Sequence, residues 1–152
     1  MMISTMSTPN QNLELDIEVI QVSIYCDIIR NILLVCPSIS VIKAAVFAFI
    51  IKKQDIRRVK LFSAKNSSDL VLKFLSQAYG QFEEFLAQLP YIFESIRILD
   101  YSNKCEVHAG VLISPNRHTE RAGVFDSFTY NSLKESNSYS DRQFLREMIS
   151  IV

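Results

Sequence analysis

One stretch of the sequence, SVIKAAVFAFIIKKQDIRRVK at residues 40–60, restricts the possible folds more than any other. It is almost uninterrupted in apolar residues over 41–51 and then turns basic. A helix that crosses a bilayer needs about 20 apolar residues, whereas this run is shorter and already contains Lys43. Its alanines favour a helix, for which Ser40 is a suitable N-cap. We therefore predict a helix over 41–53 that is apolar on nearly every side and lies at the centre of a protein core.

Length and charge limit the class of protein. The chain has 152 residues, of which 49% are apolar, and only 3 glycines and 4 prolines. These values are typical of one globular domain with a substantial core. Because the 16 basic and 16 acidic side chains cancel, no global field attracts the protein to nucleic acid or to an acidic membrane. Any such contact has to be local.

Further helices are predicted on both sides of the apolar run. Upstream, apolar residues recur at helical spacing over 17–35, and Pro37 ends this helix. Downstream, a helix with its N-cap at residues 67–68 is predicted to break near Gly80. Pro90 suits the first turn of a separate helix.

Two segments have the pattern of short strands. RVKLFS indicates a strand over 59–62, and CEVHAGVLIS indicates a hairpin that turns at Ala109 and Gly110. A final helix is expected over 140–151. The order helix, short strand, helix, helix, hairpin across 41–114 is the order of a winged-helix domain.

The predicted fold is therefore mostly α (α+β), with a winged-helix-like core, a small β-hairpin, an added N-terminal helix and a C-terminal helical arm. We expect a disordered N-terminal tail, a winged-helix-like interaction domain, an exposed loop and a C-terminal helical arm. These parts are predicted at residues 1–13, 14–114, 115–126 and 127–152 respectively.

The cysteines and the first residues indicate a compartment. The 3 cysteines are an odd number with no C-x-x-C spacing and no histidine nearby in a ligand pattern, so neither a zinc site nor a disulfide framework is expected. The opening MMISTMSTPNQN lacks the basic and apolar regions of a secretion signal. We expect a cytoplasmic protein with no metal and no cofactor.

No motif in the sequence predicts an enzyme. Phosphate-binding loops such as G-x-x-x-x-G-K-[ST] and nucleophile elbows are absent. His118 and Glu120 are close in sequence, but they fall in a predicted loop, which seldom holds the geometry of an acid–base pair. We predict no catalytic residues.

A DNA-reading function is the alternative to an interaction module. In a DNA-binding winged helix the helix before the hairpin enters the major groove. Here that helix offers only Arg97 as a basic residue, and the hairpin offers only Lys104 and His108. These residues provide few hydrogen-bond donors for contacts with base edges. A protein-interaction module is therefore the first interpretation, and an independent transcriptional regulator is the second.

Charge is distributed unevenly along the chain, and this asymmetry can orient the protein on a partner. Residues 1–27 contain Glu14, Asp16, Glu18 and Asp27 but no Lys or Arg. A basic cluster after the apolar run has three interpretations, namely contact with nucleic-acid phosphates, contact with an acidic partner surface, and simple solvation. The members of this basic cluster are Lys52, Lys53, Arg57, Arg58 and Lys60.

Large apolar side chains form a second group that could contact a partner. Core packing is the first explanation for them, but where a domain of this size does not bury all of them by itself, the surplus would form an interface patch. The members of this aromatic group are Tyr79, Phe82, Phe85, Tyr91 and Phe93, with Phe144 and Met148 on the last helix.

The segments EVIQVSIYCDIIRNIL, SVIKAAVFAFIIKK and FESIRILDYSNKCEVHAGVLIS give the chain a family resemblance over about residues 14–114. The chain resembles the small middle component of bacterial three-component ABC-ATPase systems, the group that includes the accessory subunit of Lamassu-type antiphage complexes. The resemblance lies in the pattern of hydrophobicity, with no catalytic or ligand motif. It implies a non-catalytic subunit of a hetero-oligomer, one that joins an SMC-like or ABC-type ATPase to an effector, commonly a nuclease, and helps to sense foreign DNA.

Overall fold

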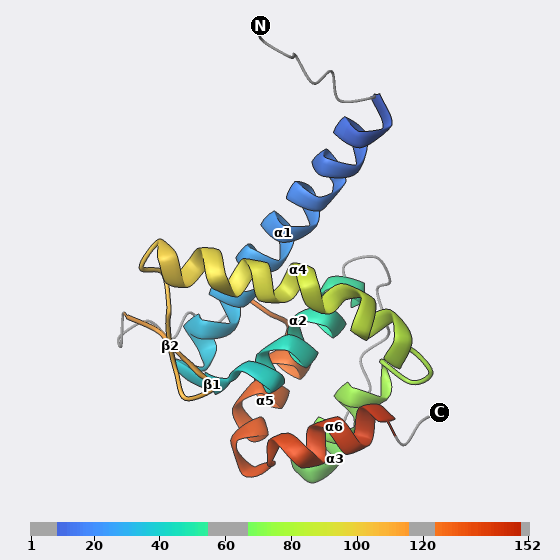
Figure 1. Ribbon diagram of the computed structural model, residues 1–152. Coiled ribbons are helices and arrows are strands. Elements are labelled where there is room, and N and C mark those ends of the chain that lie inside the picture. The colour runs from blue at the N-terminus through green and yellow to red at the C-terminus, as the bar shows by residue number, and fades with distance from the viewer. Residues whose placement is uncertain (1–8, 55–66, 116–123, 150–152) are drawn as a thin grey trace, which may run out of the picture.

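A computed structural model describes residues 9–54, 67–115 and 124–149. In these ranges the chain is mostly α-helical with one small sheet, as predicted (Figure 1). The elements in chain order are α1 (Pro9–Val35), β1 (Ser38–Ser40), α2 (Val41–Gln54), α3 (Ser67–Ser76), α4 (Phe82–Tyr101), β2 (Glu106–His108), β3 (Val111–Ile113), α5 (Ser127–Glu135), the 3-10 helix η1 (Ser136–Ser138) and α6 (Asp141–Ile149).

Helix α2 lies at the centre of the core, and this confirms the prediction made from its apolar run. Every residue over 43–51 is buried. Ser40 is the N-cap, since its Oγ accepts a hydrogen bond from the amide of Lys43 at 3.1 Å. Helices α1, α4 and α6 pack around α2. The rings of Phe47 on α2 and Phe144 on α6, for example, lie 5.7 Å apart between centroids.

The sheet has three antiparallel strands in the order β1-β3-β2. Ile39 of β1 and Val107 of β2 both pair with Leu112 of β3. The predicted hairpin is confirmed, because β2 and β3 are joined at Ala109 and Gly110 with φ of +50° and +76°. Positive φ at both central residues is what a two-residue type I′ turn requires.

The topology is winged-helix-like, and its sheet includes a strand, β1, that the sequence did not predict. Strand β1 precedes α2 and pairs with the hairpin, while α3 is an additional helix between α2 and α4. Pro37 favours extended backbone and ends α1, and its carbonyl oxygen accepts a hydrogen bond from the amide of Ser114 at 2.7 Å. The strand predicted over 59–62 lies outside the described residues.

Helix α4 continues through Pro90, so the prediction of a separate helix beginning there is wrong. Pro90 is exposed, whereas Phe85 before it and Ile92 after it are buried. The proline ring therefore points away from the core, and burial of apolar residues on both sides offsets the backbone hydrogen bond that Pro cannot donate. The predicted break near Gly80 is confirmed, since α3 ends at Ser76 and Gly80 has φ of +72°.

The described part of the predicted C-terminal helical arm is helical and packs against other helices of the chain. Helix α5, at the start of the predicted arm, packs against α3, and α6 packs against α2 and α3 (Figure 1). Helix α6 begins with a capping box, in which Ser140 and Gln143 each accept a hydrogen bond from the backbone amide of the other. At the other end of the chain, α1 begins at Pro9, so part of the predicted tail is helical.

Candidate interaction surface

The first half of α1 extends away from the body (Figure 1). Only the second half of this 27-residue helix packs against α2 and α4, through buried residues such as Tyr25, Ile29 and Ile32. Every residue over 12–20 is exposed. We call residues 12–24 the projecting half of α1. Near its base, Gln21 and Val22 contact Lys52 and Ser95 of the body, whereas its other apolar side chains are exposed, namely Leu13, Leu15, Ile17, Val19, Ile20 and Ile24.

Two rows of apolar side chains run along the projecting half of α1. A row arises because residues three or four apart lie on the same face of a helix. Leu13, at 61% exposed, and Ile20, at 56%, belong to the first row. The second row starts exposed and passes into the contact with α4. The first row comprises Leu13, Ile17, Ile20 and Ile24, and the second comprises Leu15, Val19, Val22 and Cys26.

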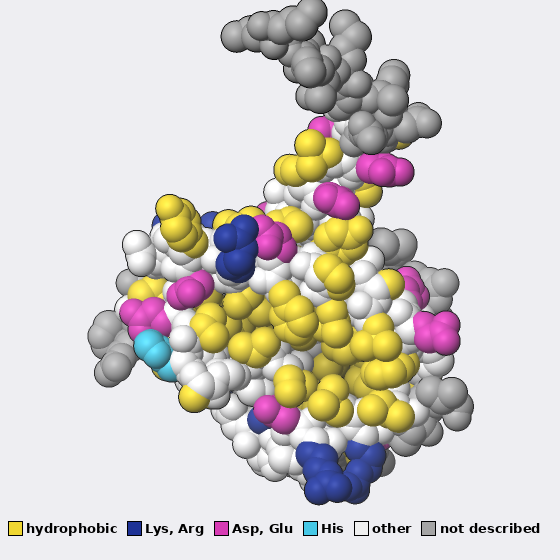
Figure 2. Space-filling view, viewed as in Figure 1, with side chains coloured by type: hydrophobic (Ala, Val, Ile, Leu, Met, Phe, Trp, Pro, Cys, Tyr) yellow, Lys and Arg dark blue, Asp and Glu magenta, His cyan; other side chains and the backbone are white. Residues whose placement is uncertain are grey.

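Acidic side chains separate the two rows. Glu14, Asp16 and Glu18 are exposed, and within the described residues none of them forms an ion pair. The first basic residue of the chain is Arg30. Figure 2 shows apolar and acidic side chains next to one another along this helix, with no basic side chain among them. The projecting half of α1 is therefore both apolar and negatively charged.

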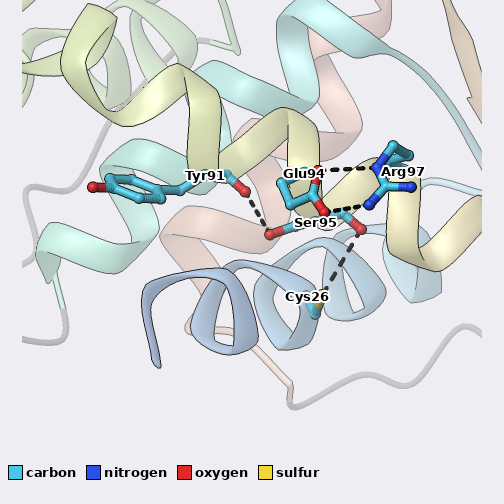
Figure 3. A network of polar contacts seen from close by, with 5 residues as sticks. All are labelled: Cys26, Tyr91, Glu94, Ser95 and Arg97. Atoms are coloured by element: carbon cyan, nitrogen blue, oxygen red, sulfur yellow. Dashed lines mark hydrogen bonds and ion pairs between the residues drawn. The ribbon is translucent and has the colours of Figure 1, made fainter. Parts of the chain in front are cut away.

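A polar contact fixes the position at which α1 leaves the body (Figure 3). Ser95 of α4 is fully buried against α1. Its hydroxyl lies 2.9 Å from the carbonyl oxygen of Val22 and 2.7 Å from that of Tyr91. The thiol of Cys26 donates to the carbonyl oxygen of Ser95 at 3.7 Å. A small residue at position 95 thus lets the two helices approach closely.

The outer face of α4 carries a further apolar surface. Leu86 and Phe93 are about half exposed, and Tyr101 is 87% exposed. Figure 2 shows apolar side chains gathered on the face that α4 and the elements below it present. Arg97 on this face is held by Glu94 through two hydrogen bonds (Figure 3), so its guanidinium group is already paired.

The predicted aromatic group divides between core and surface. Phe85, Phe144 and Met148 are buried in the core of their own chain. Their side chains cannot contact a partner in this conformation, so for these residues the interface prediction is replaced by core packing. Tyr79 and Phe93 are 54% and 50% exposed, and they keep the prediction of an interface. The remaining members, Phe82 and Tyr91, are half-buried.

Lys52 of the predicted basic cluster is used inside the protein. Its ammonium group lies 4.8 Å from the centroid of the Tyr25 ring and donates hydrogen bonds to Gln21 and Gln88. Tyr25 donates from its hydroxyl to Gln88 at 2.7 Å. Burial lowers the pKa of Lys52 from its ordinary value, because desolvation disfavours the charged form. These contacts join α1, α2 and α4.

The rest of the basic cluster is only partly described. Lys53 forms an ion pair with Glu84 at 2.5 Å and lies 5.0 Å from the centroid of the Phe49 ring. A contact between nucleic acid and either Lys52 or Lys53 would therefore compete with internal contacts. The other predicted members, Arg57, Arg58 and Lys60, lie outside the described residues.

The hairpin and its surroundings offer little to a nucleic acid. His108 lies 3.2 Å from the carboxylate of Glu106, and both are exposed. Lys104 is exposed at the end of α4. In the described part of the chain, no group of His, Cys, Asp and Glu side chains could hold a metal ion, and no helix is long and apolar enough to cross a membrane.

The chain was compared with protein families, curated proteins and solved structures. No protein-family model matches the chain, and neither the curated proteins nor the solved structures contain a match.

The exposure of the first row of α1 was not predicted. Its spacing indicated a helix face, which the sequence pattern assigned to packing. A signal was nevertheless present, since Leu15 and Val19 add a second apolar face to the same segment. A helix at the surface of a globular domain normally needs one such face.

Proposed function

We propose that this chain is a non-catalytic accessory subunit that bridges an SMC-like or ABC-type ATPase and an effector, commonly a nuclease, in a cytoplasmic antiphage or anti-plasmid defence complex. The observation that carries the proposal is the projecting half of α1. Its apolar side chains over residues 13–20 are exposed, and an apolar surface of this kind is typical of a protein-binding site. The resemblance to middle components of ABC-ATPase systems supplies the class of partner.

Covering the exposed apolar side chains of α1 would contribute favourable free energy to binding. Burying a Leu or Ile side chain completely contributes about 1.5–3 kcal/mol. Leu13, Leu15, Ile17, Val19 and Ile20 are each about half exposed. Covering each of them would therefore contribute on the order of 1 kcal/mol, before the entropic cost of association is subtracted. The outer face of α4 offers a second surface, which suits a subunit that contacts two partners.

The winged-helix-like topology supports a second function, that of an independent DNA-binding regulator. The sheet order β1-β3-β2, with α4 directly before the hairpin, is the arrangement that such a regulator would use. Against this function stand the pairing of Arg97 with Glu94 and the acidic residues along α1. An interaction subunit agrees better with these charges, because acidic side chains repel phosphate.

The test is co-purification of the tagged full-length protein from its native host. The mass of the recovered complex and the DNA retained in it are measured at low and high salt. Recovery with a large SMC-like or ABC-type ATPase would support the bridging function. Recovery as a lone dimer that binds a defined duplex would contradict it and support the regulator.

A further inference from the structure

We propose that the first row of α1 binds an amphipathic helix of a partner protein, and that Lys or Arg residues flank the apolar seam of that partner helix. The proposal rests on the proposed function, since the partner would be a component of the same complex. It goes further by specifying what the partner must present to this chain.

The spacing of the first row is that of a coiled-coil seam. Leu13, Ile17, Ile20 and Ile24 follow one another at intervals of four, three and four residues, which is the spacing of alternating d and a positions in a heptad. All four side chains are exposed on a helix that has already formed. A second helix can therefore pack along this row over about three turns without rearrangement of the body.

The residues beside the seam determine the charge of the partner. In the heptad that places Leu13 at d, Glu14 takes the e position and Asp16 the g position. Residues at e and g contact the flanks of the opposing helix and select it by charge. Glu18 adds a third carboxylate in the same turns. The matching partner helix therefore carries basic residues at its own flanking positions.

A second copy of this chain is a poor occupant of the same seam. Two copies would bring both sets of carboxylates together, and no Lys or Arg lies between residues 12 and 29 to compensate. Like charges at flanking positions destabilise such a pair. Charge complementarity thus favours a different, basic partner.

The seam ends where the body begins. The next positions of the heptad are Asp27, which is exposed, and Asn31, which is half-buried, and neither is apolar. On a different face of the helix, Cys26 packs against α4. A partner helix can therefore cover the projecting half of α1 while the contact between α1 and α4 remains intact.

The experiment measures binding of the full-length chain to two synthetic helical peptides by fluorescence anisotropy at low ionic strength. Both peptides have three heptads with Ile at a and Leu at d. One has Lys at every e and g position, and the other has Glu there. We expect the chain to bind the Lys peptide about tenfold more tightly than the Glu peptide, and this ratio should fall as salt is added.

Charge reversal supplies the matched comparison. The double variant Glu14→Lys/Asp16→Lys should reverse the preference, so that it favours the Glu peptide. The control variant Glu83→Lys/Asp100→Lys has the same change in net charge at exposed positions of α4 and should keep the preference of the wild type. Ile17→Gln should weaken binding of the Lys peptide, whereas Ile149→Gln, at an equally exposed isoleucine of α6, should leave it unchanged.

Three results would overturn the inference. The first is equal binding of both peptides or of neither. The second is a dimer of the isolated chain that dissociates on Ile17→Gln, because the occupant would then be a second copy. The third is an unchanged preference of the Glu14→Lys/Asp16→Lys variant for the Lys peptide, because these carboxylates would then not select the partner helix.

The failure of this inference is distinguishable from the failure of the proposed function. If the wild type recovers an ATPase and the Ile17→Gln and Glu14→Lys/Asp16→Lys variants recover equal amounts, the bridging function stands and the seam is not the binding site. If the wild type prefers the Lys peptide but recovers no ATPase, the inference about the seam stands and the bridging function fails.

Discussion

The hydroxyl of Ser95 on α4 lies 2.9 Å from the carbonyl oxygen of Val22 on α1. This contact joins two helices that are far apart in sequence, next to the contact between Cys26 and Ser95 that Figure 3 draws. Every residue over 12–20 is exposed, whereas from Tyr25 onward one face of α1 is buried in the core. The contact thus lies close to the boundary between the part of α1 that stabilises the fold and the part that we propose binds a partner.

Substitutions at Ser95 test the close approach of α1 and α4. Ser95→Ala removes a buried hydrogen bond and should lower the free energy of unfolding by about 1 kcal/mol. Ser95→Leu overpacks the contact and should cost about 1–3 kcal/mol. Urea unfolding measures both changes. Ser102→Ala is the control, since the Ser102 hydroxyl bonds only to carbonyl oxygens of its own helix; wild-type stability of Ser95→Leu would contradict the close approach.

Alanine substitutions at Phe144 and Phe93 distinguish a side chain that packs in the core from one that is exposed at the surface. Phe144 is fully buried and its ring lies 6.2 Å from that of Tyr139, so Phe144→Ala should destabilise the chain by about 3–5 kcal/mol. Phe93 is half exposed, and Phe93→Ala should cost less than about 1 kcal/mol. Thermal unfolding of the isolated protein provides the measurement. Equal effects of the two substitutions would contradict the docking of α6 on the body.

The protein should lose stability at alkaline pH because of Tyr25. Burial, followed by the charge of Glu84, raises the pKa of the Tyr25 hydroxyl above its ordinary value of 10.0. The folded state then holds this proton to higher pH than the unfolded state does. The stabilisation is complete below pH 10 and is lost as the pH rises above 10. The pKa of Lys52 is lowered in the folded state, so this residue destabilises the fold below its ordinary pKa of 10.5. That destabilisation disappears as the pH rises above 10.5, which partly opposes the effect of Tyr25.

A comparison of Tyr25→Phe with the wild type isolates this effect. The variant lacks the hydrogen bond to Gln88 and should be less stable near neutral pH by about 1 kcal/mol. Its melting temperature should then fall less steeply than that of the wild type between about pH 9 and pH 11. Burial also raises the pKa values of Cys26 and Cys105, but both cysteines are common to the two proteins. Parallel pH profiles would contradict the role of Tyr25.

The cysteines should be unreactive in the folded protein. Burial, followed by the charge of Asp100, raises the pKa of the Cys105 thiol to about 11, and burial also raises the pKa of Cys26. Cys36 is buried. Since the thiolate is the reactive form, alkylation at about pH 8 should be slow in the native state and should reach all 3 cysteines after unfolding.

An introduced thiol provides the control for this alkylation. Tyr101→Cys places a cysteine at a position that is 87% exposed in the wild type, and this cysteine should be modified within minutes under the same conditions. Equally fast modification of the native cysteines would show that the core opens readily.

The sequence predicted the elements that local chemistry determines. The apolar run of α2, the N-cap Ser40, the break at Gly80 and the turn at Ala109–Gly110 all depend on neighbouring residues. Strand β1 is too short to show a periodicity, and it exists because it pairs with β3, which lies far along the chain. Such a strand could not be predicted from local pattern.

The candidate site was only partly predictable for a similar reason. Periodicity shows which side chains share a face, but it does not show whether another element covers that face. Ile17 and Ile28 have the same chemistry, yet Ile17 is exposed and Ile28 is buried. Lys52 likewise belongs to a basic run in the sequence, but the ring of Tyr25 from α1 lies beneath its ammonium group. The tertiary arrangement of α1 determines which of these side chains are buried and which are exposed.

The continuity of α1 has a mechanical consequence. At about 1.5 Å of rise per residue, its 27 residues span about 40 Å. No Gly or Pro occurs between residues 10 and 35, so the helix has no obvious hinge. A partner that binds the first turns of α1 would therefore also determine the orientation of the sheet and of the outer face of α4, because rotation of a rigid helix rotates everything packed on its other end.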